Sequence, residues 1–174
     1  MKLIPETQEG KTQDGIISRF INPGEFFFCE SNCQIHTILG SCIAITLWHP
    51  DLLIGGMCHF VLPGSSAANK LALPDGLLNG RYADEAMALF EREITKRGTH
   101  FPEYQAKIFG GSNMIINSTL REDELIGTKN AEAAKKHLSE KGIPILAAHI
   151  GATGHRRIAF DVATGDVWVK HELL

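Results

Sequence analysis

The chain has 174 residues, of which 44% are hydrophobic and 21% charged, and its formal net charge is −3 at pH 7. This length suits one core, so we expect a single domain over residues 1–174. The slightly acidic charge, without a basic stripe, argues against a nucleic-acid partner. No apolar run approaches the roughly 20 residues of a membrane helix, which argues against membrane insertion. Residues 1–10 turn polar after Pro5 and do not resemble a signal peptide, so we expect a cytoplasmic protein.

Apolar runs bounded by turn residues predict β-strands along much of the chain. They cover residues 15–21, 25–30, 42–49, 55–62, 106–111 and 143–150. The end of the chain predicts a further hairpin around Ala163-Thr164-Gly165. Because strands dominate without regular βαβ alternation, the sequence predicts an α+β fold.

Two helices and one long loop are expected between these strands. Residues 81–98 predict a helix that ends at Gly98, with Tyr82, Ala86, Leu89, Phe90 and Ile94 as its apolar stripe. Residues 130–142 predict a second helix, with Asn130 as its N-cap and Gly142 as its stop. Residues 64–80, rich in Gly, Ser, Ala, Asn and Pro, predict a long loop of the kind that often carries function.

The hairpin predicted around Pro50-Asp51 brings a cysteine and a histidine together. A two-residue turn there makes Cys42 face His59, and the Cβ atoms of directly opposed residues lie roughly 4.5–5.5 Å apart. A slip of one residue would put Cys58 opposite Cys42 and turn His59 to the other face.

A thiol beside an imidazole can act as a nucleophile with its base, because the imidazole takes the proton and stabilises the thiolate. The hydroxyl of Thr37 could orient the imidazole, which is the third role in such triads. The alternative is that Cys42 and His59 are ordinary core residues, the commoner role for a cysteine in an apolar strand.

Two glycine-containing segments are candidates for binding the oxyanion of an acyl-transfer reaction. Backbone N–H groups around Ser41 and Cys42 could hold it, since Gly40 lets the chain bend there. Gly110 and Gly111, at the end of a predicted strand, are the second candidate.

The other candidate sites have weaker patterns. We expect free thiols rather than disulfides in a reducing compartment. A zinc site is a further alternative, with the ligands Cys29, Cys33, Cys58 and His59, although their spacing is not that of a zinc knuckle. Residues 151–154 with Arg156 and Arg157 could bind an anion, or could be a solvated turn. The sequence contains no phosphate-loop or dinucleotide motif.

Several blocks in one order resemble the CheD family, the chemoreceptor glutamine deamidases of bacterial and archaeal chemotaxis. The blocks are NPGEFFF (22–28), HTILGSCIAITLWHP (36–50), GGMCHFVLP (55–63), RYADEAM (81–87), KIFGGSNM (107–114), IGTKN (126–130) and ATGDVWVK (163–170). The resemblance covers nearly the whole chain. It implies layered mixed β-sheets with packed helices, distantly like other cysteine hydrolases, and no metal or organic cofactor.

The resemblance also implies roles for three residues. Cys42 would be the nucleophile, His59 the base, and Thr37 the residue that completes the site. The substrate would be a glutamine on the helical cytoplasmic region of a chemoreceptor, converted to glutamate with release of ammonia. Such a site should be open, with residues 64–80 as a wall, and the docking surface should accept a helix.

The family resemblance leaves a second function open. Members also bind a CheC-type phosphatase, so a non-catalytic chemotaxis adaptor is the alternative. Two positions depart from the family pattern: His155 stands where we expect glycine, and Cys58 where many members have Ala or Asn. Cys58, next to His59, could alter substrate fit or redox sensitivity.

Overall fold

The computed structural model describes residues 10–11, 15–30, 32–66 and 76–174. Residues 1–9, where we expect no signal peptide, and residues 67–75 of the predicted loop lie outside this part. Within the described ranges, no helix is both long and apolar enough to cross a membrane.

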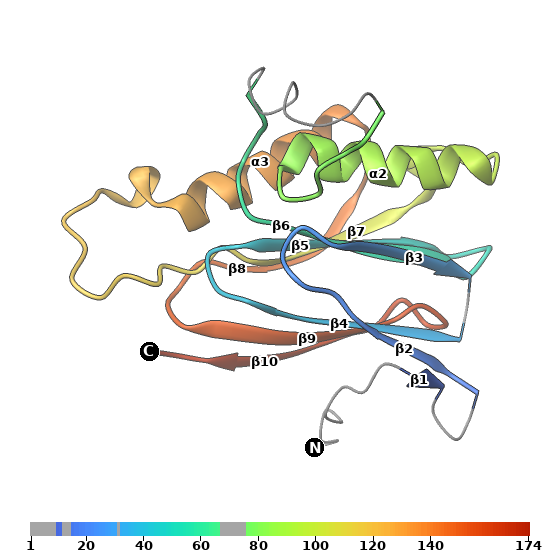
Figure 1. Cartoon of the computed structure of the whole chain (residues 1–174), viewed down its shortest axis with the longest axis horizontal. Helices are drawn as coiled ribbons and strands as arrows, with labels where there is room; N and C mark the ends of the chain where they lie inside the picture. Colours follow the sequence, from blue (N-terminus) through green and yellow to red (C-terminus); the bar gives the residue numbers. More distant parts are fainter. Residues whose placement is uncertain (1–9, 12–14, 31, 67–75) are drawn as a thin grey trace.

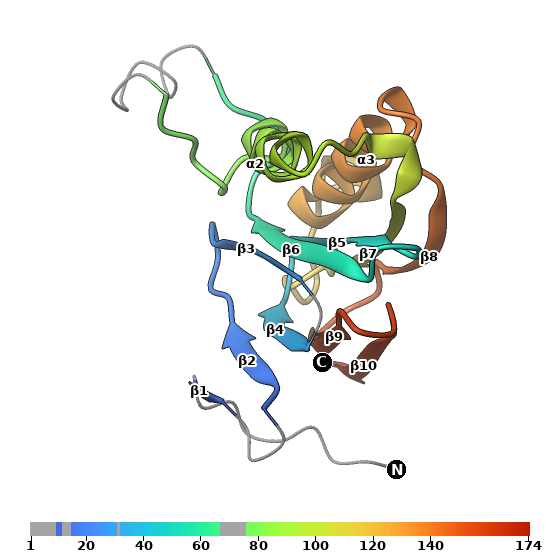
Figure 2. The same cartoon turned by 90° about the vertical axis from the view of Figure 1, so that its right-hand side faces the viewer.

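The strands form two five-stranded sheets that stack face to face (Figure 1; Figure 2). The first sheet has the order β1 (Gly10–Lys11), β2 (Ile17–Phe20), β4 (Cys33–Leu39), β9 (His155–Asp161) and β10 (Val167–Glu172). The second has the order β3 (Phe26–Glu30), β6 (Ile54–Phe60), β5 (Ile43–His49), β7 (Gln105–Gly110) and β8 (Ile145–Ile150). Both are mixed, because β2–β4 and β7–β8 are parallel while their other pairs are antiparallel. The predicted α+β fold and the final hairpin are confirmed.

Helices cover the outer face of the second sheet, so the layers are helices, second sheet and first sheet (Figure 1). They are α2 (Ala83–Lys96) and α3 (Ile126–Glu140), with the short 3₁₀ turns η1 (Phe101–Glu103) and η2 (Glu122–Glu124). Helix α2 is confirmed: Ala86, Phe90 and Ile94 of its predicted stripe are buried. The chain leaves α2 through Gly98, whose φ is 67°.

The predicted start of the second helix is wrong. Asn130 is not the N-cap, because α3 begins four residues earlier at Ile126. Gly127 is a residue type that disfavours helices, yet it lies inside α3, where its backbone packs closely against Gly111. A Cβ atom on it would lie 2.5 Å from the carbonyl oxygen of Gly111. Tertiary packing therefore overrides the local signal against a helix at this glycine.

Alternate side chains of β5 divide between two cores. Ile43, Ile45 and Leu47 belong to the core under the helices, whereas Ala44 belongs to the core between the sheets and Trp48 packs against it. A residue's parity along β5 and β6 therefore decides whether it faces the helices or the other sheet.

The predicted register of the β5–β6 hairpin is wrong by two residues. His59 pairs with Ala44, not with Cys42, and Cys42 lies just before β5. The connection includes the four residues 50–53 rather than a two-residue turn, and the N–H of Leu53 donates to the carbonyl of His49 at 2.9 Å. Because the shift is even, His59 stays on the face that the prediction assigned to it.

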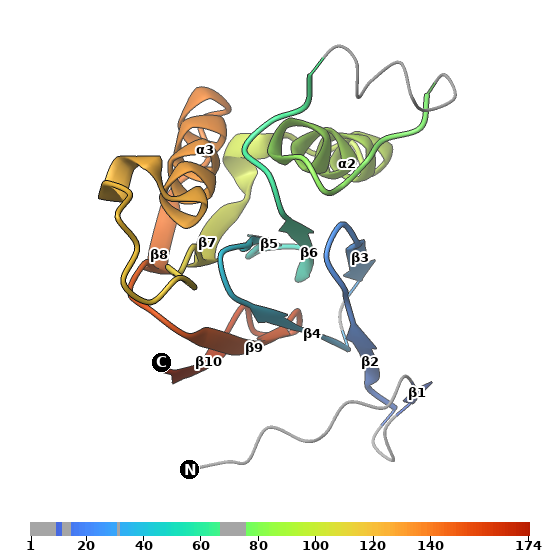
Figure 3. The same ribbon diagram turned by 60° about the vertical axis from the view of Figure 1, so that its left-hand side comes forward.

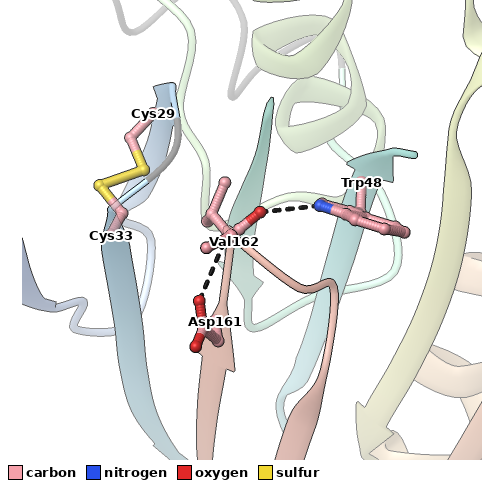
Figure 4. Close-up of a disulfide and its surroundings, with 6 residues drawn as sticks. Cys29, Cys33, Trp48, Asp161 and Val162 are labelled. Carbon is pink, nitrogen blue, oxygen red and sulfur yellow. Dashed lines mark hydrogen bonds between the residues drawn. A yellow bond between two sulfur atoms is a disulfide. The ribbon is translucent and has the colours of Figure 1, made fainter. Parts of the chain in front are cut away.

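The expectation that all cysteines are free is also wrong. Cys29, in β3, and Cys33, at the start of β4, form a disulfide (Figure 4). The short connection between the two strands brings their Cα atoms to 6.6 Å, within the usual disulfide range of about 4.4–6.8 Å. Cys42 and Cys58 are free. Figure 4 also shows Trp48 on β5 donating to the carbonyl of Val162 at 2.8 Å, across the two sheets.

Candidate active site

Cys42 lies where the chain crosses from the first sheet to the second. Residues 40–42 connect β4 to β5, and Figure 3 shows this connection rising between the two layers. The Cys42 side chain is half-buried and packs against the core between the sheets. The thiol therefore sits at the edge of the inter-sheet space.

His59 faces the same inter-sheet space from β6. Its Nδ1 lies 2.8 Å from the Oγ1 of Thr37, which belongs to β4 of the other sheet. Both residues are buried, His59 at 1% exposure and Thr37 at 0%. The predicted association of Thr37 with the imidazole is therefore present as a hydrogen bond between the sheets.

The same hydrogen bonds define the tautomer of His59. Thr37 Oγ1 also lies 2.7 Å from the carbonyl oxygen of Ile21, which can only accept. A hydroxyl has one proton, so Thr37 donates to Ile21 and accepts from the Nδ1–H of His59. The Nε2 atom is then unprotonated; it is buried and has no hydrogen-bond partner in the described residues. An imidazole held this way is ready to accept a proton at Nε2.

Burial keeps both groups neutral near pH 7. It lowers the pKa of His59 from 6.5 to about 4, an effect that the negative charge of Glu25 opposes. Burial also raises the pKa of Cys42, while the positive charge of Arg81 and the backbone N–H of Cys42 itself lower it. A neutral thiol and a neutral imidazole thus border the same inter-sheet space, and the sulfur can attack only after its proton has been transferred to a base.

Gly110 and Gly111 lie against the backbone of Cys42. A Cβ atom on Gly110 would be 2.1 Å from the Cys42 carbonyl oxygen, so only glycine fits there. The N–H of Gly111 donates to that same oxygen at 2.9 Å. Next to them, Ser112 N–H donates to the carbonyl of Gly40 at 2.9 Å. These contacts fix the segment 40–42 from the β7 side.

Asn130 was not among the predicted site residues, although it ends the IGTKN block. It is completely buried on α3. Its Nδ2 donates to the carbonyl oxygen of Ser41 at 3.0 Å and to that of Val61 at 2.8 Å. Only its position in a family block could have indicated it, since both partners are distant in the sequence.

The anion-site alternative is wrong for Arg156. The side chain is 1% exposed and donates to acceptors within the protein. Its partners are His149 Nδ1 at 2.8 Å, the carbonyl oxygens of Gly151 at 2.8 Å and Gly110 at 3.4 Å, and Ser112 Oγ at 2.5 Å. The guanidinium therefore ties β9 to the ends of β7 and β8 instead of facing a ligand.

The zinc alternative is wrong as well. Cys29 and Cys33 are bonded to each other, and Cys58 faces the helices while His59 faces the other sheet. Burial raises the pKa of Cys58 to about 12. The side chain of Cys58 is fully buried and faces away from His59, so an effect of Cys58 on substrate fit or redox sensitivity stays a prediction. Over the described ranges, no group of three or more His, Cys, Asp or Glu residues is placed to hold a metal ion.

A cavity of about 380 Å³ opens beside residues 40–42, with Ser41 in its wall. Its wall includes Ser41, Ser112 and Met114, together with Leu120 and Ile126. Met114 lies over Gly40: a Cβ atom there would be 3.0 Å from the Met114 sulfur. The described residues of the predicted loop, 64–66 and 76–80, are not part of this wall.

Comparisons with known proteins identify the family of the chain. The family described as CheD chemotactic sensory transduction matches residues 61–171. A probable chemoreceptor glutamine deamidase CheD 3 of Dechloromonas aromatica is 44% identical over 150 residues, covering 86% of this chain and 85% of that protein. A probable chemoreceptor glutamine deamidase CheD 2 of Albidiferax ferrireducens is 43% identical over 159 residues, covering 91% of this chain and 88% of that protein.

Among solved structures, the hypothetical protein YfiH of Bacillus licheniformis matches with a TM-score of 0.42 and 14% identity, over 71% of this chain and 49% of that one. The family match itself begins after Cys42 and His59. The matches of 150 and 159 residues in a 174-residue chain, however, necessarily span residues 37–59. By its matched family region and by its identity to these relatives over most of their length, the chain belongs to the CheD family.

Proposed function

We propose that this protein is a chemoreceptor glutamine deamidase with Cys42 as nucleophile, His59 as base and Thr37 as the residue that orients His59. The observation that carries the proposal is the hydrogen bond between Thr37 and His59, which leaves Nε2 unprotonated beside the inter-sheet space that Cys42 borders. Two CheD relatives named as deamidases support the choice of substrate.

The reaction begins when His59 Nε2 takes the proton of the Cys42 thiol. Opposite charges formed side by side attract each other, so burial favours a thiolate–imidazolium pair over either charge alone. The thiolate attacks the side-chain amide carbon of a receptor glutamine, and the carbonyl oxygen becomes an oxyanion. The N–H of Cys42 is the candidate donor to this oxyanion, because the N–H of Gly111 is already bonded to the Cys42 carbonyl.

Collapse of this intermediate breaks the carbon–nitrogen bond. The imidazolium gives its proton to the leaving ammonia, and a thioester to Cys42 remains. His59 then takes a proton from water, which attacks the thioester carbon. The carbon–sulfur bond breaks, the imidazolium returns its proton to the Cys42 sulfur, and the receptor is left with glutamate at this position. A glutamate methyl ester would form the same thioester with loss of methanol, so we propose ester hydrolysis as a side activity.

The substrate glutamine belongs to the cytoplasmic helical region of a receptor, which places the proposed activity in the cytoplasm. A CheC-type phosphatase is a further proposed partner. The non-catalytic adaptor remains the second candidate function, because a docking protein of this family would keep the same fold.

The test is incubation of the purified protein with a chemoreceptor cytoplasmic fragment, followed by peptide mass spectrometry. The variants are Cys42→Ala and, as a matched control, Cys58→Ala, which removes the other free cysteine on the opposite face of the sheet. We expect glutamine-to-glutamate conversion by the wild type and by Cys58→Ala, and none by Cys42→Ala. Binding of the fragment without conversion by the wild type would overturn the deamidase and favour the adaptor.

A further inference from the structure

The buried amide of Asn130 joins the two segments that carry the proposed nucleophile and base. Its Nδ2 donates to Ser41, the residue before Cys42, and to Val61, two residues after His59. Both N–H groups of the amide are thus used within the site. One side chain on α3 thus joins residues 40–42, which connect β4 to β5, to the residue that follows β6.

The contact with Ser41 has a consequence for the neighbouring N–H. The carbonyl of Ser41 and the N–H of Cys42 belong to one peptide group, and the described residues contain no cis peptide bond. In a trans peptide these two groups point in opposite directions within one plane. A donor that holds the Ser41 oxygen therefore holds the Cys42 N–H pointing away from Asn130. It also polarises the peptide, which strengthens that N–H as a donor.

The other features of Asn130 give no separate reason for an amide at this position. Asparagine is a poor residue inside a helix. Its Oδ1 is buried and has no hydrogen-bond partner in the part of the chain that the structure describes. The two donated hydrogen bonds are what the side chain contributes, and one of them falls on the peptide next to the nucleophile.

We propose that Asn130 is a positioning residue that orients the Ser41–Cys42 peptide so that the Cys42 N–H binds the oxyanion. The inference rests on the proposed function in its assignment of Cys42 as an acyl-transfer nucleophile. Asn130 acts through the peptide that it holds. The packing of α3 against Gly110 and Gly111 supports this placement, because a Cβ atom on Gly127 of α3 would collide with Gly111.

The test compares two reactions of Cys42 that differ in whether an oxyanion forms. Acylation by p-nitrophenyl acetate passes through a tetrahedral oxyanion, whereas alkylation by iodoacetamide is a direct displacement at carbon and forms none. Both rates are measured at Cys42 by peptide mass spectrometry, under conditions in which Asn130→Ala has the circular dichroism spectrum of the wild type, because unfolded chains would expose the thiol to both reagents. Glu132→Ala, an exposed change on the same helix, is the matched control, and Cys42→Ala gives the background for both reagents.

We expect the ratio of acylation to alkylation to fall about 10- to 100-fold in Asn130→Ala, less than the roughly 10²–10³-fold cost of deleting an oxyanion donor outright. The ratio should stay at the wild-type value in Glu132→Ala. In Asn130→Ser, which keeps one short donor, it should fall by an intermediate amount. An unchanged ratio in Asn130→Ala, whether both rates fall together or neither falls, would overturn the proposal.

These reagents need no receptor, so the two proposals can fail separately. A reduced ratio in Asn130→Ala, combined with a wild type that converts no receptor glutamine, would support the positioning role and refute the deamidase. An unchanged ratio in Asn130→Ala, combined with a wild type that converts receptor glutamine, would refute the positioning role and support the deamidase.

Discussion

Replacing Thr37 by valine tests how the proposed base is held. The change keeps the shape of the side chain but removes the hydroxyl that donates to Ile21 and accepts from His59. Two buried groups then lose their partner, and each such loss costs about 1–3 kcal/mol. We expect the free energy of unfolding to fall by roughly 2–6 kcal/mol, measured by urea denaturation.

The same substitution should slow the reaction. Without Thr37 nothing in this arrangement holds the Nδ1–H tautomer of His59, so Nε2 is not kept free for the thiol proton. Loss of an orienting interaction of about 1–3 kcal/mol corresponds to a roughly 5- to 150-fold lower rate, since 1.36 kcal/mol is tenfold. The assay is conversion of receptor glutamine by mass spectrometry, with ¹⁵N NMR of the imidazole to report the tautomer.

Thr37→Ser is the matched control because it keeps the hydroxyl. We expect it to retain most of the activity and the same tautomer. The reasoning would be refuted by a Thr37→Val variant as fast as the wild type, or by a Thr37→Ser variant as slow as Thr37→Val.

Further predictions concern the surroundings of Cys42 and His59. Gly110→Ala puts a Cβ atom 2.1 Å from the Cys42 carbonyl oxygen at a φ of 109°, and should lower the free energy of unfolding by about 2 kcal/mol or more; an unchanged urea midpoint would contradict this. Because burial lowers the pKa of His59 from 6.5 to about 4, the unfolded chain binds the proton first. Unfolding free energy should therefore fall as the pH drops from 6.5 toward 4, by up to about 3 kcal/mol, and fall less in His59→Gln. Arg81 lowers the pKa of Cys42, so Arg81→Gln should move the pH dependence of alkylation by iodoacetamide upward; no movement would exclude this charge effect.

The secondary structure could largely be predicted because strands and helices follow local patterns. The apolar runs of β5 and β6 and the apolar stripe of α2 depend on residues close in the sequence. The errors fall where distant contacts intervene. Helix α3 starts at Ile126 because its first turn packs against Gly111, and the hairpin register follows from the length of the connection at 50–53.

In the candidate site, too, local patterns indicate some residues, whereas contacts between distant segments decide the others. Cys42 and His59 could be nominated because a hairpin brings them near each other, and the even shift in register preserved the face of His59. No local pattern indicates the role of Asn130, since its partners Ser41 and Val61 lie 89 and 69 residues away. The disulfide differs from the expectation of free thiols because that expectation rests on a reducing compartment. The adjacency of β3 and β4, which brings Cys29 to Cys33, is a feature of the tertiary structure.

The sequence by itself determined the α+β fold class, the family and the choice of Cys42, His59 and Thr37, because these follow from local patterns and from blocks in a fixed order. Only the tertiary structure decided how the three are held. The tautomer of His59 depends on a hydroxyl from the other sheet, and the orientation of the Ser41–Cys42 peptide depends on an amide from α3. Hydrogen bonds of this kind act over about 3 Å, so they exist only once the layers are stacked and the connections have brought distant residues into contact.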